Sequence, residues 1–116
     1  MTLKEFYDVI KGDYDDAISK FRTDEKARKN LDKIVNEGSY SQMLVAFENK
    51  NFEEAYKSAQ VFKSACKNVS LSGLAYSVSI FADAIRGKQD IDEEITTQLK
   101  KLKKDYAVTM ACIQML

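Results

Sequence analysis

The sequence contains no histidine, no proline and no tryptophan, and it has only two cysteines and four glycines. Without histidine, the chain has no imidazole to act as a general base, a metal ligand or a phosphoryl acceptor. Two thiols without histidine also fall short of the ligand set that a structural zinc site needs. Glycine-rich phosphate loops and nucleophile elbows are absent as well. We therefore expect no enzymatic activity, no metal site and no cofactor.

The scarcity of helix breakers favours helix through nearly the whole chain. Proline stops helices and glycine weakens them, whereas the helix formers Ala, Leu, Lys, Glu and Gln are abundant here. No stretch alternates polar and apolar residues for long enough to predict a strand. With 116 residues, the chain is long enough to bury the core of one domain and too short for two.

Charge and hydropathy limit the partners that the chain is expected to bind. Eighteen basic and eighteen acidic side chains cancel, so no overall field attracts nucleic acid or an anionic membrane. No apolar run is long enough to cross a bilayer, and residues 1–5 lack the apolar stretch of a secretory signal. The basic run 100–104 follows the acidic run 92–94, a pattern that helix-dipole compensation explains. We expect a cytoplasmic protein that binds neither nucleic acid nor membrane.

Capping pairs and apolar spacing divide the chain into successive amphipathic helices. Residues 2–22 are expected to form short N-terminal helices, and residues 24–116 the core. Because the connections are short, neighbouring helices should pack antiparallel. The sequence predicts a single all-α domain, residues 1–116, built as an up-and-down antiparallel four-helix bundle with short additional N-terminal helices. The expected helix starts are Thr2 with Glu5, Asp13, Thr23, Ser39 with Gln42, Asn51 with Glu54, and Asp90 with Glu93.

Three segments show most clearly the apolar spacing of bundle helices, with steps of three and four residues. The same stripes contain Cys66 and lie close to Cys112, which we expect to be buried free thiols. The predicted inward residues are Phe52, Ala55, Ala59, Phe62, Cys66 and Val69 in the first segment, Leu71, Leu74, Val78, Phe81 and Ile85 in the second, and Ile91, Ile95, Leu99, Leu102, Tyr106, Met110 and Ile113 in the third.

The first of these segments carries the most specific motif of the chain. Residues 59–64 have the sequence Ala-Gln-Val-Phe-Lys-Ser, after a short acidic turn and an apolar helix. This resembles the signature helix of histidine-containing phosphotransfer (HPt) domains, Ala-His-x-Leu-Lys-Gly. The resemblance is strongest over residues 43–86. Two positions match the signature, Ala59 and Lys63. Three positions differ: Phe62 replaces the leucine, Ser64 replaces the glycine, and Gln60 replaces the phospho-accepting histidine.

The resemblance implies an HPt-like fold and a place where partners dock. Gln60, Lys63, Ser64 and Lys67 occupy positions i, i+3, i+4 and i+7, so they share one helix face. In the family, this face meets a response-regulator receiver domain or a histidine kinase. The amide nitrogen of glutamine is not basic and does not accept a phosphoryl group. The expected function is therefore that of a non-catalytic binding adaptor or decoy in two-component phosphorelay signalling.

Two alternatives to this interpretation stay open. The face formed by Gln60, Lys63, Ser64 and Lys67 is also what an ordinary solvated helix surface looks like. The domain could also have a structural or assembly role unrelated to phosphotransfer, acting through another surface. Reversing the charge at Lys63 separates these cases, because only a docking face loses its partner.

Overall fold

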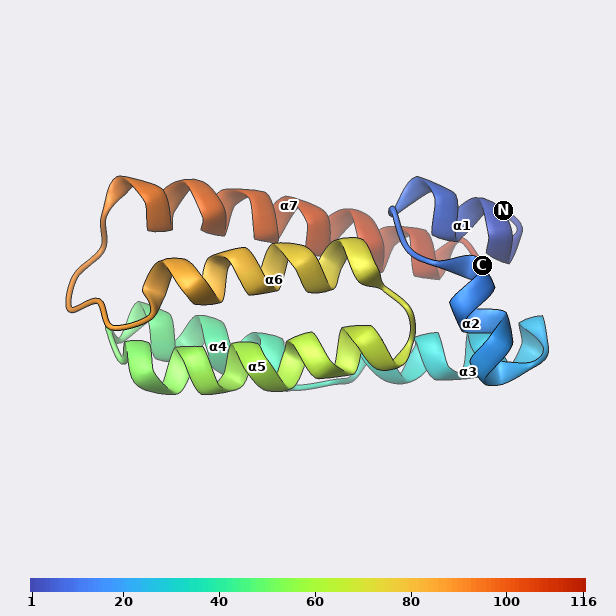
Figure 1. Ribbon diagram of the computed structural model, residues 1–116, viewed down its shortest axis with the longest axis horizontal. Helices are drawn as coiled ribbons and strands as arrows, with labels where there is room; N and C mark the ends of the chain where they lie inside the picture. The colour runs from blue at the N-terminus through green and yellow to red at the C-terminus, as the bar shows by residue number, and fades with distance from the viewer.

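The computed structural model describes residues 1–116 and consists of α-helices and their connections, with no strand. The prediction of an all-α protein is therefore confirmed. Figure 1 shows seven helices along the chain. Their bounds are α1 (Leu3–Val9), α2 (Tyr14–Phe21), α3 (Asp24–Val35), α4 (Ser39–Glu48), α5 (Phe52–Asn68), α6 (Ser72–Ile85) and α7 (Glu93–Gln114). None of them is long and apolar enough to cross a membrane.

Helices α4 to α7 lie side by side along the long axis of a molecule that measures 45 × 20 × 20 Å. Each packs mainly on its neighbours in the sequence, and the chain reverses direction at each turn (Figure 1). Helix α3 lies roughly end to end with α4, whereas α1 and α2 cover the end of the molecule near the C-terminus. This order places α5 directly against α6.

The predicted inward residues of α5 and α6 form the centre of the core. All of them are buried, and the rings of Phe62 and Phe81 are completely enclosed. Aromatic stacking joins neighbouring helices: Tyr40 of α4 stacks on Tyr106 of α7 with ring centroids 3.6 Å apart. The prediction for the last segment is wrong at one position, because Ile91 lies before α7 begins and is exposed. Burial of Cys66 and Cys112 as free thiols is confirmed.

Most helices begin where the sequence predicts. Thr2 and Glu5 form a reciprocal capping box at α1, and the side chains of Asp13, Thr23 and Asn51 cap α2, α3 and α5. In each case the side-chain oxygen accepts a backbone N–H that the helix leaves free. Local sequence therefore determines where these helices begin.

Two predicted caps are wrong, because the side chains that match the motif have other partners. At α4 the cap is Gly38, and Ser39 donates its backbone N–H and its hydroxyl to the Glu37 carboxylate. At α7 the cap is Asp92, whose carboxylate accepts the Ile95 N–H at 2.8 Å. Asp90 instead accepts the N–H of the next residue and the Nζ of a lysine, which fixes the turn before α7.

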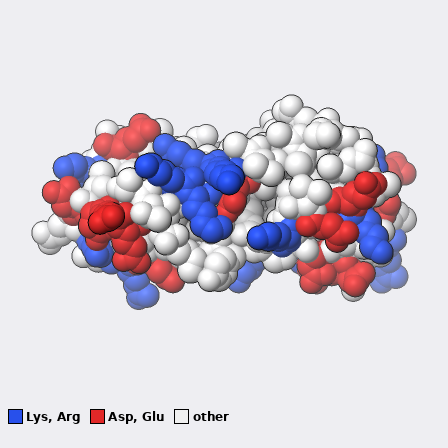
Figure 2. Space-filling model, turned by 90° about the horizontal axis from the view of Figure 1, so that it is seen from above, with Lys and Arg blue, Asp and Glu red and all other residues white.

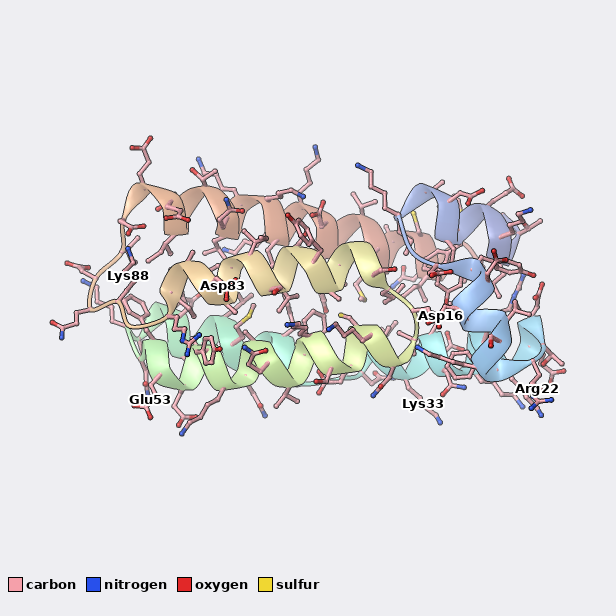
Figure 3. All side chains as sticks on the ribbon, viewed as in Figure 1. Asp16, Arg22, Lys33, Glu53, Asp83 and Lys88 are labelled. Atoms are coloured by element: carbon pink, nitrogen blue, oxygen red, sulfur yellow. The ribbon has the colours of Figure 1, made fainter.

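The N-terminal helices are held against the turn that joins α5 to α6. The Tyr7 hydroxyl donates to the Val69 carbonyl at 2.8 Å, and the Ser70 hydroxyl donates to Asp16 at 2.6 Å. Figure 3 shows Asp16 beside this turn. A Cβ on Gly73 would lie only 2.7 Å from the Ile10 carbonyl oxygen, so only glycine allows this close approach. The α1–α2 turn is thereby fixed on the first turn of α6.

Candidate functional site

The four predicted site residues lie on α5 with different degrees of exposure. Ser64 and Lys67 are exposed, whereas Gln60 and Lys63 are half-buried. The opposite side of the helix carries Ala59, Phe62 and other core residues, which are buried. Helix α6 packs closely beside α5, and Lys63 lies in the lining that the two helices share.

A groove of about 270 Å³ runs between α5 and α6. Helix α5 contributes Lys63 and Lys67, whereas Gln60 and Ser64 lie outside the lining. The structure thus brings two of the four predicted residues together in a concavity. The residues that α6 adds to this lining are Ser72, Ala75, Tyr76 and Ser79.

Sequence reasoning missed the contribution of α6 to this groove. Its four lining residues have the spacing i, i+3, i+4 and i+7, the same spacing as the predicted face of α5. Small side chains at three of these positions let the two helices leave open space between them. The signal was therefore present in the sequence as a stripe of small and polar residues with one aromatic.

The groove carries the positive charge of two lysines. Neither Lys63 nor Lys67 belongs to any ion pair of the structure. No carboxylate lines the groove, and the serine hydroxyls and the phenol of Tyr76 supply further hydrogen-bonding groups. Tyr76 is 64% exposed, so its ring is available to a partner. The arrangement suits an anionic group with an apolar neighbour.

Helix α5 also carries a cysteine, whose free thiol is buried. Cys66 lies on the core side of α5, and burial, aided by the nearby Glu37 carboxylate, raises the pKa of its thiol. A thiol with a raised pKa is mostly protonated and is a poor nucleophile. The structure contains no group of three or more Cys, Asp or Glu side chains that could hold a metal ion.

Comparisons of this chain with protein-family models, with curated proteins and with solved structures found no match. The motif in residues 59–64 and the unpaired lysines beside it are the features that point to a function.

Proposed function

We propose that the protein is a binding module of the HPt type that has lost its phosphorylatable histidine. It binds a receiver domain or a histidine kinase without accepting phosphate, and acts as an adaptor or decoy in two-component signalling. In this proposal it works in the cytoplasm on protein partners. Helices α4 to α7 are its up-and-down four-helix bundle, α3 extends this core, and α1 and α2 are the additional N-terminal helices.

The observation that carries the proposal is the position of the HPt-like motif in the fold. Lys63, which the motif keeps, lines the α5–α6 groove together with Lys67, and Gln60 lies on the same helix one turn earlier. The partners of HPt domains present a phosphorylated or free aspartate. A carboxylate or phosphate is the group that unpaired lysines and serine hydroxyls bind well.

The replacement of histidine limits the module to binding. The side-chain nitrogen of Gln60 is part of an amide, so its lone pair is delocalised and it does not attack phosphorus. The amide still donates and accepts hydrogen bonds near the position of an imidazole. A partner can therefore recognise the face while its phosphate stays in place.

Charge reversal at the groove tests the proposal. We expect the wild-type protein to capture a receiver domain or kinase from a lysate of its host, identified by mass spectrometry. Purified partner should then bind Lys63→Glu about tenfold or more weakly, because a carboxylate replaces the ammonium at the contact. The matched control is Lys4→Glu, which reverses an exposed lysine in the first turn of α1.

The outcome also decides between signalling and a structural or assembly role. Under the structural alternative, Lys63→Glu and Lys4→Glu behave alike, and the captured proteins include no receiver or kinase. Circular dichroism of both variants checks that each remains folded. Equal binding by the wild type and Lys63→Glu would show that the α5–α6 groove does not bind the partner.

A further inference from the structure

A second and larger groove lies on the other side of Tyr76. It has a volume of about 390 Å³ and runs between the end of α1, the start of α6 and the middle of α7. Tyr76 is the one residue that lines both grooves. Neither the HPt-like motif nor the proposed function uses this second groove.

The walls of this groove combine exposed apolar side chains with lysines. Val9 from α1, Tyr76 from α6 and Val108 from α7 are 55%, 64% and 42% exposed. Lys11, Lys101 and Lys104 stand in the same lining. Large apolar side chains that stay exposed around one concavity are typical of a docking surface.

The positive charge of the groove is largely unneutralised. Lys11 and Lys104 form no ion pair. Lys100 and Lys103, which lie on α7 together with Lys104, form none either. Asp105 is the one acidic residue in the lining, and it already binds Lys101 at 3.0 Å and the Ser77 hydroxyl. Figure 2 shows Lys and Arg side chains gathered over the middle of α7, beside a broad surface without charge.

The groove is preformed, because the segment that makes its α1 wall is fixed in place. The backbone of Ile10 and Lys11 lies against Gly73, and the Gly12 N–H donates to the Tyr7 carbonyl at 2.8 Å. The Asp13 N–H donates to the carbonyl of Ser70 at 3.1 Å. A wall that is already ordered lowers the entropy cost of binding.

We propose that this second groove binds an acidic peptide segment that carries a bulky apolar side chain. The apolar side chain packs between Val9, Tyr76 and Val108, and the carboxylates face Lys11 and Lys104. Charge complementarity selects an acidic segment. Nucleic acid is disfavoured because Tyr76 is a single aromatic ring without a stacking series and the net charge of the chain is zero.

Binding of a defined probe tests this proposal. The probe is a short fluorescein-labelled peptide of Glu, Asp, Leu and Phe, and its control has Lys in place of every acidic residue. We expect fluorescence anisotropy to rise with the acidic probe only, and salt to weaken the binding. Amide chemical shifts in an NMR titration should change at the end of α1 and the middle of α7.

Matched variants assign the binding to this groove. Lys104→Glu should weaken the probe about tenfold or more, whereas Lys103→Glu, an exposed neighbour outside the lining, should have a much smaller effect. Val108→Ala should weaken it more than Val45→Ala, which truncates a valine on α4 that is even more exposed, 58% against 42%. Lys63→Glu should leave probe binding unchanged, so this proposal and the receiver-docking proposal can fail separately.

Several results would overturn the proposal. One is equal weakening by Lys104→Glu and Lys103→Glu, which would mean attraction by the basic helix as a whole. Another is loss of probe binding in Lys63→Glu alone, which would place the peptide in the α5–α6 groove. Binding of anionic lipid vesicles in place of the peptide, or dimerisation that buries the groove, would assign it to a different occupant.

Discussion

At the scale of single residues, the position of Gln60 determines what the motif can do. Its side chain is half-buried on α5, one turn before Lys63, and the core side of the helix holds Ala59 and Phe62 in place. A histidine placed at this position would therefore be presented on a helix that the core holds in place. The glutamine that occupies it lacks the basic nitrogen of an imidazole.

We predict that Gln60→His gains the ability to accept a phosphoryl group. An imidazole at this position has the lone pair that the amide lacks, and Lys63 stands one turn away to bind the phosphate oxygens. The measurement is transfer of radioactive phosphate from a phosphorylated receiver domain to the protein, followed by acid treatment. A phosphohistidine is acid-labile, so the label should be lost in acid.

The controls for this experiment are the wild type and the double variant Gln60→His, Ser64→Gly. The wild type should stay unlabelled, and the double variant should be labelled at least as fast as the single one, because glycine opens the approach to the ring. Acid-labile label on the wild-type protein would contradict the proposed function directly.

At the scale of the elements, α5 and α6 depend on their buried aromatic rings. Phe62 and Phe81 are fully enclosed, and Phe62 also contacts the ring of Tyr40 with centroids 5.3 Å apart. We predict that Phe62→Ala and Phe81→Ala each lower the free energy of unfolding by about 3–5 kcal/mol. Gln60→Ala should change it by about 0.5 kcal/mol or less. Urea denaturation followed by circular dichroism measures all three, and near-equal losses would mean that the assigned faces of α5 are incorrect.

The sequence predicts element types and inward residues well because both follow from local spacing. Leu74, Val78 and Phe81 repeat at helical intervals, so burial of this stripe determines which side of α6 faces the core. Helix starts are harder to predict when two acidic residues compete. Asp90 and Asp92 both precede α7 closely enough to cap it. In the structure Asp90 forms an ion pair with Lys50, and Asp92 caps the helix.

Only the α5 part of the candidate site could be predicted from the sequence, because local spacing determines one helix face but not how two helices pack. The face of α5 follows from the spacing of Gln60, Lys63 and Lys67, because one helix determines it. The groove needs a second helix at a particular rotation and distance, and Tyr76 enters it only because α6 packs on α5. The α1 wall of the second groove needs in addition the close contact at Gly73.

At the scale of the whole molecule, the lack of histidine shapes the dependence of stability on pH. No side chain has an ordinary pKa between about 5 and 8, so the free energy of unfolding should be nearly constant there. Changes are expected where carboxylates titrate at the acid end, and where thiol and phenol groups and the Lys88 ammonium, whose pKa is raised by its hydrogen bond to Asp92, titrate at the alkaline end.

On the acid side, a few carboxyl groups hold their charge more strongly in the folded protein than in the unfolded chain. Hydrogen bonds from Lys20 and Ser70 lower the pKa of Asp16. A hydrogen bond from Lys88, aided by the Ile95 N–H, lowers the pKa of Asp92. Groups with a lowered folded pKa stabilise the protein above their unfolded pKa of about 4, and that stabilisation is lost as the pH falls through the folded value.

Asp105 adds to the acid response from a more covered position between α6 and α7. Burial alone would raise the pKa of this carboxyl, but hydrogen bonds from Ser77 and Lys101 outweigh burial and lower it. Its contribution therefore has the same sign as those of Asp16 and Asp92. Acid should therefore weaken the hydrogen bonds and ion pairs that these carboxylates form. They link α2 to the α5–α6 turn, link α6 to α7, and cap α7.

On the alkaline side, buried acids hold their protons in the folded state. Burial raises the pKa of the Cys66 thiol and of the Tyr7 phenol, and raises the pKa of Tyr40 to about 12. A raised folded pKa means that stability is fully present below the unfolded pKa and is lost as the pH rises. The loss should begin above about pH 8.5, where an unfolded thiol ionises, and steepen above about pH 10 with the tyrosines.

We therefore predict a plateau of stability between about pH 5.5 and 8, with a fall on either side. Urea midpoints measured across the pH range check this, and Asp92→Asn should give a shallower acid limb because one titrating cap is removed. A clear change of midpoint between pH 6 and 7 would contradict the prediction, since no side chain here ordinarily titrates in that interval. Gln60→His supplies the matched comparison: it adds the only imidazole, so any midpoint change that appears near neutral pH reports the surroundings of position 60 alone.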